Sequence, residues 1–170
     1  FVGSRGLGDV YKRQQQTLPP IVKYGLTFLF VQSEFGLCCP LSMTDSLTRT
    51  LTKFGDKKLI EKFFDQLTSQ DLDHLFQGAM FMTEQHAGSD VGSIDTYAEY
   101  EDGNWFLTGD KWFCSNPDAD LAMVLARHDK TISGTKGLAL FLLPKKLENG
   151  NQNNYETVSY THLRAHETQR

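Results

Sequence analysis

One stretch decides the fold of this 170-residue chain: Met80-Phe81-Met82-Thr83-Glu84-Gln85-His86-Ala87-Gly88-Ser89-Asp90. Its apolar start, Ala79 to Met82, is typical of a short buried strand, and Gly88 and Asp90 mark a turn after it. Such a strand end leaves backbone N–H groups in a tight loop beside the Thr83 and Ser89 hydroxyls. The loop can hold a planar, acceptor-rich ligand or an anion. Spacing alone favours an ordinary strand followed by a polar turn.

Apolar spacing predicts helices before this stretch. Pro19 and Pro20 suit the first turn of a helix over Ile21 to Val31, which ends before Gly36. This helix is apolar nearly all round, so we expect it to be buried in a helical bundle. A second helix is expected from Pro40 to Leu51.

Capping residues set the limits of the next two helices. Ser42 or Thr44 can serve as the N-cap of the second helix. Gly55 ends that helix, and Asp56 is the expected N-cap of a third helix over Lys57 to Leu67.

After Ser69 the helical spacing stops, and short strands separated by turns are expected. Asp102-Gly103 is typical of a hairpin turn. Besides Ala79 to Met82, the expected strands are Ile94–Glu101, Asn104–Thr108, Lys111–Ser115, Asp120–Arg127 and Gly137–Leu143. The last two are apolar enough to be buried on both faces. Several short strands at regular spacing predict a small antiparallel barrel or sandwich.

A second polar stretch is also informative about the function: Gly109-Asp110-Lys111-Trp112-Phe113-Cys114-Ser115-Asn116. The first stretch resembles the flavin-binding loop of the acyl-CoA dehydrogenase family, Met-Thr-Glu-x-x-Ala-Gly-Ser-Asp. The second resembles that family's Gly-x-Lys-x-(aromatic)-x-(Ser/Thr)-Asn signature. The order and spacing of the two stretches also fit the family.

The resemblance implies an α+β fold: the end of an N-terminal α-helical domain (residues 15–69), then an antiparallel β-barrel middle domain (residues 70–157). On the same resemblance, we expect the family's C-terminal helical domain to be missing from this chain.

The resemblance implies FAD as the cofactor. Thr83 would reach the pyrimidine edge of the isoalloxazine ring, and Ser89 would meet both the flavin and the acyl thioester substrate. Phe113 would cover the ring face away from substrate, and the Ser115 hydroxyl would point at N5. The implied cofactor-binding residues are Met80, Phe81, Met82, Thr83, Gly88, Ser89, Phe113, Cys114 and Ser115.

Neighbouring residues have plainer interpretations. Gln85 and His86 stand where the family usually has Pro or Gly, and we interpret His86 as an exposed loop histidine. We interpret Cys114 as a small buried residue rather than a reactive thiol. Lys111 is expected to be a solvated charge.

The implied reaction is α,β-dehydrogenation of an acyl-CoA thioester. The family's glutamate base lies in the C-terminal domain, so no residue here, Glu84 included, is assigned as catalytic. An electron-transfer partner and a homo-oligomer are implied for the full-length protein.

Three other functions remain open. Cys39-Pro40-Leu41-Ser42-Met43-Thr44 resembles the alkylation-response branch of the family. An acyl-CoA oxidase is a second neighbour, distinguished by reoxidation of the flavin with O₂. A non-enzymatic β-barrel interaction module is the alternative from a different class.

Residues 1–14 and 158–170 are interpreted as tails translated from a sequencing adaptor. Codons for Asp9 to Gln14, when reverse-complemented and read in a shifted frame, give Val158 to His162. The match extends from Ser4–Gly8 to Leu163–Glu167. We therefore exclude both tails from fold prediction and expect the remainder to be a fragment of a longer protein.

Composition excludes several classes of function. The chain has a formal net charge of −4, and without the +3 of the two tails the remainder carries −7. Such acidity argues against a nucleic-acid partner, which needs clustered Lys and Arg. Cys38, Cys39 and Cys114 show no metal-ligand spacing, so no metal and a reducing, cytoplasmic location are expected.

Overall fold

The structure is a computed structural model, and it describes residues 19–157. Within these residues the chain forms three helices and then one five-stranded sheet. The elements are α2 (Pro20–Ser33), α3 (Cys38–Phe54), α4 (Lys57–Leu67), β1 (Gly78–Phe81), η1 (Val91–Ser93), β2 (Tyr97–Glu101), β3 (Asn104–Thr108), β4 (Leu121–Arg127), η2 (Gly134–Gly137) and β5 (Leu138–Pro144). The two predicted adaptor tails lie outside the described residues.

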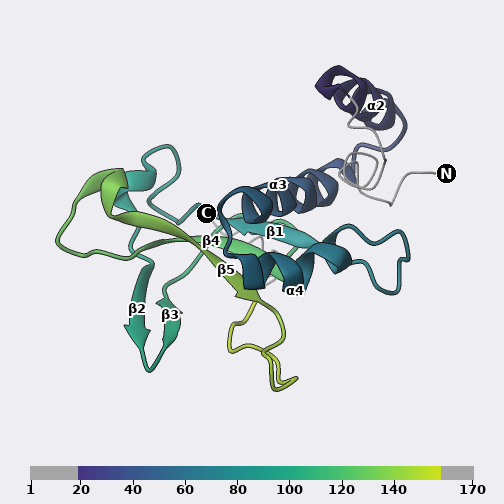
Figure 1. Cartoon of the computed structure of the whole chain (residues 1–170). Coiled ribbons are helices and arrows are strands. Elements are labelled where there is room, and N and C mark those ends of the chain that lie inside the picture. Colours follow the sequence, from purple (N-terminus) through teal and green to yellow (C-terminus); the bar gives the residue numbers. More distant parts are fainter. Residues whose placement is uncertain (1–18, 158–170) are drawn as a thin grey trace, which may run out of the picture.

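The helices are arranged unequally around the sheet. In Figure 1, α3 and α4 lie beside the sheet, whereas α2 stands apart from it. No helix within residues 19–157 has both the length and the apolar character needed to cross a membrane.

Two predicted helix starts have different outcomes. The Asp56 carboxylate accepts the N–H groups of Lys58 (2.7 Å) and Leu59 (3.1 Å), which confirms it as the N-cap of α4. The prediction that Ser42 or Thr44 caps the second helix is wrong, because α3 already begins at Cys38. The Thr44 hydroxyl instead accepts the N–H of Gly78 at 2.9 Å and so joins α3 to β1.

The predicted burial of the first helix is also wrong. Ile21, Phe28 and Leu29 of α2 are 76%, 66% and 61% exposed. The buried residue of this helix is Lys23, which forms an ion pair with Asp45 of α3. Within the described residues α2 therefore presents its apolar side chains to solvent.

Strand β4 is the centre of the sheet. It pairs along its whole length with β5 in the antiparallel sense. Its first half pairs with β1 in the parallel sense, from Gly78–Leu121 to Phe81–Val124. It also meets β2 in a parallel pairing at Tyr97–Arg127. The predicted antiparallel barrel is therefore wrong for the described residues, because the sheet is mixed and open.

The loop that carries most of the first motif connects β1 to β2, and both of these strands pair with the same edge of β4. Since β5 occupies one edge of β4, β1 and β2 must share the other. β1 ends at the pair Phe81–Val124, and β2 begins at the pair Tyr97–Arg127. Residues 82–96 are thus an excursion between two strands that run in the same direction.

The β2–β3 hairpin is as predicted, with Asp102 and Gly103 at positive φ of 47° and 83°. The first hairpin strand begins at Tyr97 rather than Ile94.

The expected strand over Lys111–Ser115 is wrong, because residues 111–116 are irregular. Phe113 and Asn116 adopt positive φ of 56° and 55°, which a strand does not accommodate. β4 is almost wholly buried as predicted, whereas β5 is only partly buried.

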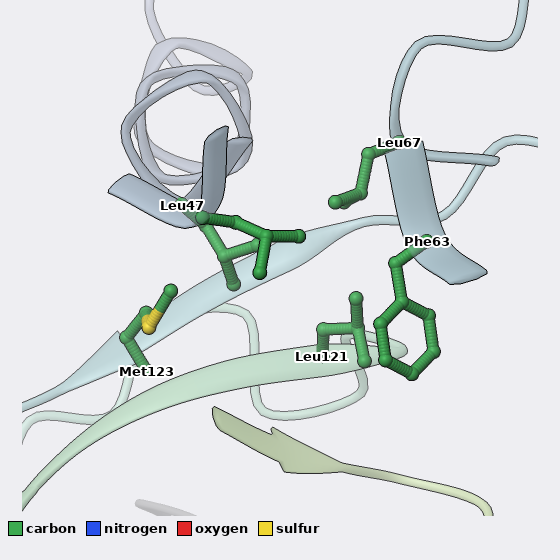
Figure 2. Close-up of a cluster of buried hydrophobic side chains, with 6 residues drawn as sticks. Leu47, Phe63, Leu67, Leu121 and Met123 are labelled. Atoms are coloured by element: carbon green, nitrogen blue, oxygen red, sulfur yellow. The ribbon is translucent and has the colours of Figure 1, made fainter. Parts of the chain in front are cut away.

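The main core lies between the helices and one face of the sheet. Figure 2 shows side chains of α3, α4 and β4 converging there. Its buried members are Leu47, Leu51, Phe63, Leu67, Leu121 and Met123, and Met80 packs against them. Because side chains alternate along a strand, the next residues of β1 and β4 project from the other face. That second cluster contains Ala79, Phe81, Ala119, Ala122 and Val124, with Cys114 packed against it.

Candidate functional site

The two motif segments are joined through their backbones. The N–H of Trp112 donates to the carbonyl oxygen of Thr83 at 2.8 Å. The Lys111 ammonium donates to the carbonyl oxygen of Met82 at 3.2 Å. The segment after β3 therefore lies beside the end of β1, as a common site for both motifs requires.

A buried ion pair reinforces this junction. Lys111 Nζ lies 2.7 Å from Glu84 Oε1, and the two side chains are only 8% and 4% exposed. Glu84 also accepts the backbone N–H groups of Asp95 (2.7 Å) and Thr96 (3.0 Å). The prediction that Lys111 is a solvated charge is wrong.

The electrostatics of Glu84 follow from these contacts. Burial raises the pKa of the Glu84 carboxyl, but hydrogen bonds from Lys111 and Thr96 and from the backbone of Asp95 outweigh burial and lower the pKa to about 2. Glu84 is therefore a fixed anion near neutral pH. A carboxylate held in this way is suited to a structural role and not to proton transfer.

The turn that follows Glu84 is closed by its own backbone. Glu84 and Ala87 exchange N–H···O bonds of 3.1 and 3.2 Å, and Ala87 is fully buried. His86 is exposed at the tip, as predicted, with Nε2 at 3.1 Å from Asp95 Oδ2. Gly88 and Ser89 follow on the surface.

The second motif segment directs an aromatic ring outward. Phe113 is 68% exposed and sits at a positive φ that a bulky residue rarely adopts. Asn116 supports this bend by donating from Nδ2 to the carbonyl oxygen of Gly78 at 3.3 Å. Cys114 turns inward, and burial raises the pKa of its thiol, although the nearby Lys111 opposes this. The interpretation of Cys114 as an unreactive packing residue agrees with this position.

An open depression brings part of the predicted site together. It has a volume of about 2090 Å³ and is lined by four of the predicted cofactor-binding residues, Phe81, Phe113, Cys114 and Ser115. The other five do not line it: Met80, Met82, Thr83, Gly88 and Ser89. Met80 faces the helices instead, as its packing against the main core shows. Thr83 is hydrogen-bonded through its carbonyl oxygen to the N–H of Trp112, and Trp112 does line the depression.

Aromatic side chains continue this surface across the sheet. The ring centroids of Tyr100 and Trp105 are 5.1 Å apart, and those of Trp105 and Phe141 are 5.2 Å apart. Trp105 and Phe141 line the same depression. Its wall is thus suited to a large, flat, partly apolar ligand.

One group of side chains has the spacing of a metal site. Ligand atoms of Glu84, His86 and Asp95 lie within 4.8 Å of one another. Both Glu84 oxygens, however, already accept hydrogen bonds, and Oε1 is paired with the Lys111 cation. These contacts do not favour an ion, and the absence of a metal stays a prediction.

Glu84 and Lys111 were not predicted from the sequence as residues that build the site. A signal was present, because the acidic Glu84 closely follows the apolar run of the first motif and the basic Lys111 directly precedes the aromatic residues of the second. Such a charge is buried only when it is paired, so an opposite charge in each motif was a clue to contact between them.

Comparison with known proteins shows the family to which this chain belongs. The family model "Acyl-CoA dehydrogenase, middle domain" matches residues 79–169, more than half of the chain. The chain therefore belongs to the acyl-CoA dehydrogenase family.

Individual relatives show how much of the family's length is present. The chain is 41% identical over 140 residues to acyl-CoA dehydrogenase family member 11 of Caenorhabditis elegans, a match covering 77% of this chain and 23% of that protein. It is 38% identical over 96 residues to the mitochondrial isovaleryl-CoA dehydrogenase of Arabidopsis thaliana, covering 56% and 22%. The crystal structure of C. elegans ACDH-11 in complex with C11-CoA has a similar fold, with a TM-score of 0.74 and 35% identity over 89% of this chain and 28% of that one. The chain thus spans about a quarter of the length of these relatives.

Proposed function

We propose that this chain is the flavin-holding part of an FAD-dependent acyl-CoA dehydrogenase that forms α,β-unsaturated acyl-CoA thioesters. The observation that carries the proposal is the Trp112–Thr83 hydrogen bond, which ties both flavin-motif segments together beside one open depression. Membership of the family supports the reaction type.

The described residues fit an isoalloxazine ring in part. The exposed Phe113 ring and the Ser115 side chain border the depression, and the aromatic surface of Trp105 and Phe141 extends it. Thr83 and Ser89 lie outside the lining. We therefore assign them to the rim, where the loop would meet one edge of the ring.

The chemistry divides between the cofactor and the chain. Bound FAD supplies an acceptor for the hydride that leaves the β-carbon of the acyl thioester. Phe113 would cover one face of the ring, Ser115 would donate a hydrogen bond to it, and Thr83 would orient its pyrimidine edge. Ser89 would contact both the ring and the substrate.

Other parts of the activity lie outside the described residues. We propose a glutamate base in a C-terminal helical domain of the longer protein, which would remove the α-proton. An electron-transfer partner, a homo-oligomer and a cytoplasmic location belong to the same proposal. We also propose that the chain alone binds FAD weakly, since its depression is open.

The test is the visible spectrum of the full-length protein. We expect flavin absorbance at one FAD per chain, and bleaching when an acyl-CoA is added without oxygen. Rapid recovery of colour in air, with release of hydrogen peroxide, would indicate an oxidase. A full-length protein without flavin would contradict the proposal and favour a non-enzymatic module.

A further inference from the structure

The strongest unassigned feature is the buried junction between Glu84 and Lys111. The Glu84 carboxylate receives three donors, namely Lys111 Nζ and the backbone N–H groups of Asp95 and Thr96. These donors come from two other segments: the one after β3 and the one that leads into β2. Glu84 thus connects three stretches of chain that meet at the edge of β4.

Glu84 and Lys111 belong to the two motifs, but neither is among the predicted cofactor-binding residues. Lys111 bonds to the carbonyl oxygen of Met82, and its neighbour Trp112 bonds to that of Thr83. Two successive residues of one motif are therefore fixed to two successive carbonyls of the other. Ser115 follows on the same short segment, so its position relative to Thr83 depends on these contacts.

Burial makes this pair different from the surface pairs of the same chain. Lys62 and Glu148 also lie 2.7 Å apart, but their side chains are 44% and 88% exposed. Water weakens and loosens an exposed pair, whereas a buried pair with additional hydrogen bonds keeps one geometry. Lys62–Glu148 is therefore a matched control for the chemistry of a Lys–Glu contact.

We propose that Glu84 and Lys111 are positioning residues that hold the Thr83 segment and the Ser115 segment at the separation a flavin ring requires. The inference rests on the proposed function, since it concerns the same site. Neither residue is assigned a contact with the ring. Their effect is exerted through the backbone of Met82, Thr83 and Trp112.

The experiment separates positioning from simple stabilisation. Three variants of the full-length protein are compared with wild type: Lys111→Met, the double variant Glu84→Gln/Lys111→Met, and the control Lys62→Met. For each, the urea midpoint of unfolding and the dissociation constant for FAD, from quenching of flavin fluorescence, are measured. The double variant is informative because it leaves no unpaired buried charge, so its stability should recover.

We expect Lys111→Met to lower the urea midpoint and to weaken FAD binding about tenfold or more. The double variant should regain most of the midpoint and still bind FAD about tenfold more weakly, because the link to Met82 is absent. Lys62→Met should stay within about twofold of wild type. If FAD affinity recovers together with stability, or never changes, the positioning role is wrong.

Two further outcomes are also decisive. If Lys111→Met does not fold, Lys111→Arg replaces it: the charge and the fold are kept, but the larger head group alters the spacing, so FAD binding should weaken severalfold. Unchanged affinity in Lys111→Arg would then overturn the inference. A wild-type protein that binds no FAD would overturn the proposed function instead, which is a distinguishable result.

Discussion

The backbone N–H of Trp112 donates to the carbonyl oxygen of Thr83 at 2.8 Å, and this bond joins two sequence motifs that are separated by a hairpin. Around it, Lys111 contacts Met82 and Glu84. The relationship explains why the two motifs occur together, since each holds the other in place. It also indicates which substitutions should disturb the site and which should not.

The first prediction concerns pH. The pKa of Glu84 is lowered from 4.5 to about 2 in the folded chain. A carboxyl whose pKa falls on folding stabilises the fold above its unfolded pKa, so this contribution is complete above pH 4.5 and is lost as pH falls towards 2. The lost free energy of unfolding should be about 3 kcal/mol. Urea unfolding at several pH values measures it.

A pair of variants isolates this effect. Glu84→Gln should flatten the dependence of stability on pH between 4.5 and 2. Glu148→Gln is the control, because the Glu148 pKa is also lowered, by a hydrogen bond from Lys62, but the side chain is exposed. If Glu84→Gln and wild type lose stability in parallel over this range, Glu84 is not the group responsible.

The second prediction concerns Gly109, which begins the second motif segment. A Cβ there would lie 2.5 Å from Thr96 Oγ1 and 2.7 Å from Thr96 Cα, and φ is +146°. Gly109→Ala should therefore cost more than about 2 kcal/mol of unfolding free energy, through both overlap and backbone strain. Gly103→Ala is the matched control: its φ is +83°, but no atom lies within 4 Å. It should cost only about 1 kcal/mol. Equal costs in thermal or urea unfolding would contradict the close approach.

The third prediction concerns the core in Figure 2. Leu47 is fully buried between α3 and the sheet. Leu47→Ala should remove about 2–5 kcal/mol of unfolding free energy, because the surrounding side chains cannot close the cavity completely. Leu72→Ala, at a position 59% exposed, should change it by less than about 0.5 kcal/mol. Similar urea midpoints for both variants would show that the α3–sheet core is wrongly placed.

The fourth prediction concerns α2. Its exposed apolar side chains, Ile21, Phe28 and Leu29 among them, form a surface that favours association. This 170-residue chain should therefore self-associate at micromolar concentration, and Phe28→Gln combined with Leu29→Gln should reduce this association. Sedimentation velocity measures the change. A wild-type chain that sediments as a monomer at all concentrations would be inconsistent with this exposure.

The sequence predicted those parts of the fold that depend on local signals. Asp56 and the apolar spacing after it were enough for α4, and Asp102-Gly103 was enough for the β2–β3 hairpin. Strand direction was not predictable, because the alternation of side chains is the same in parallel and antiparallel strands. The parallel pairing of β1 with β4 was therefore missed.

In the candidate site, too, the features that depend on contacts between distant segments were not predicted from the sequence. Phe113 was expected in a strand because its neighbours are apolar or aromatic, but its positive φ depends on contacts that Asn116 makes with Gly78. Lys111 was expected in solvent because its partner, Glu84, is 27 positions away in the sequence. Contacts between distant residues decide the backbone conformation in the first case and the burial in the second, and spacing within one segment does not encode them.

The most direct measurement is a crystal structure of the full-length protein with FAD bound. The account predicts that one isoalloxazine ring lies between the two motif segments, with Phe113 against its face and with Thr83 and Ser115 within hydrogen-bonding distance of its edge. An FAD ring bound elsewhere, or one that reaches only one of the two segments, would contradict it.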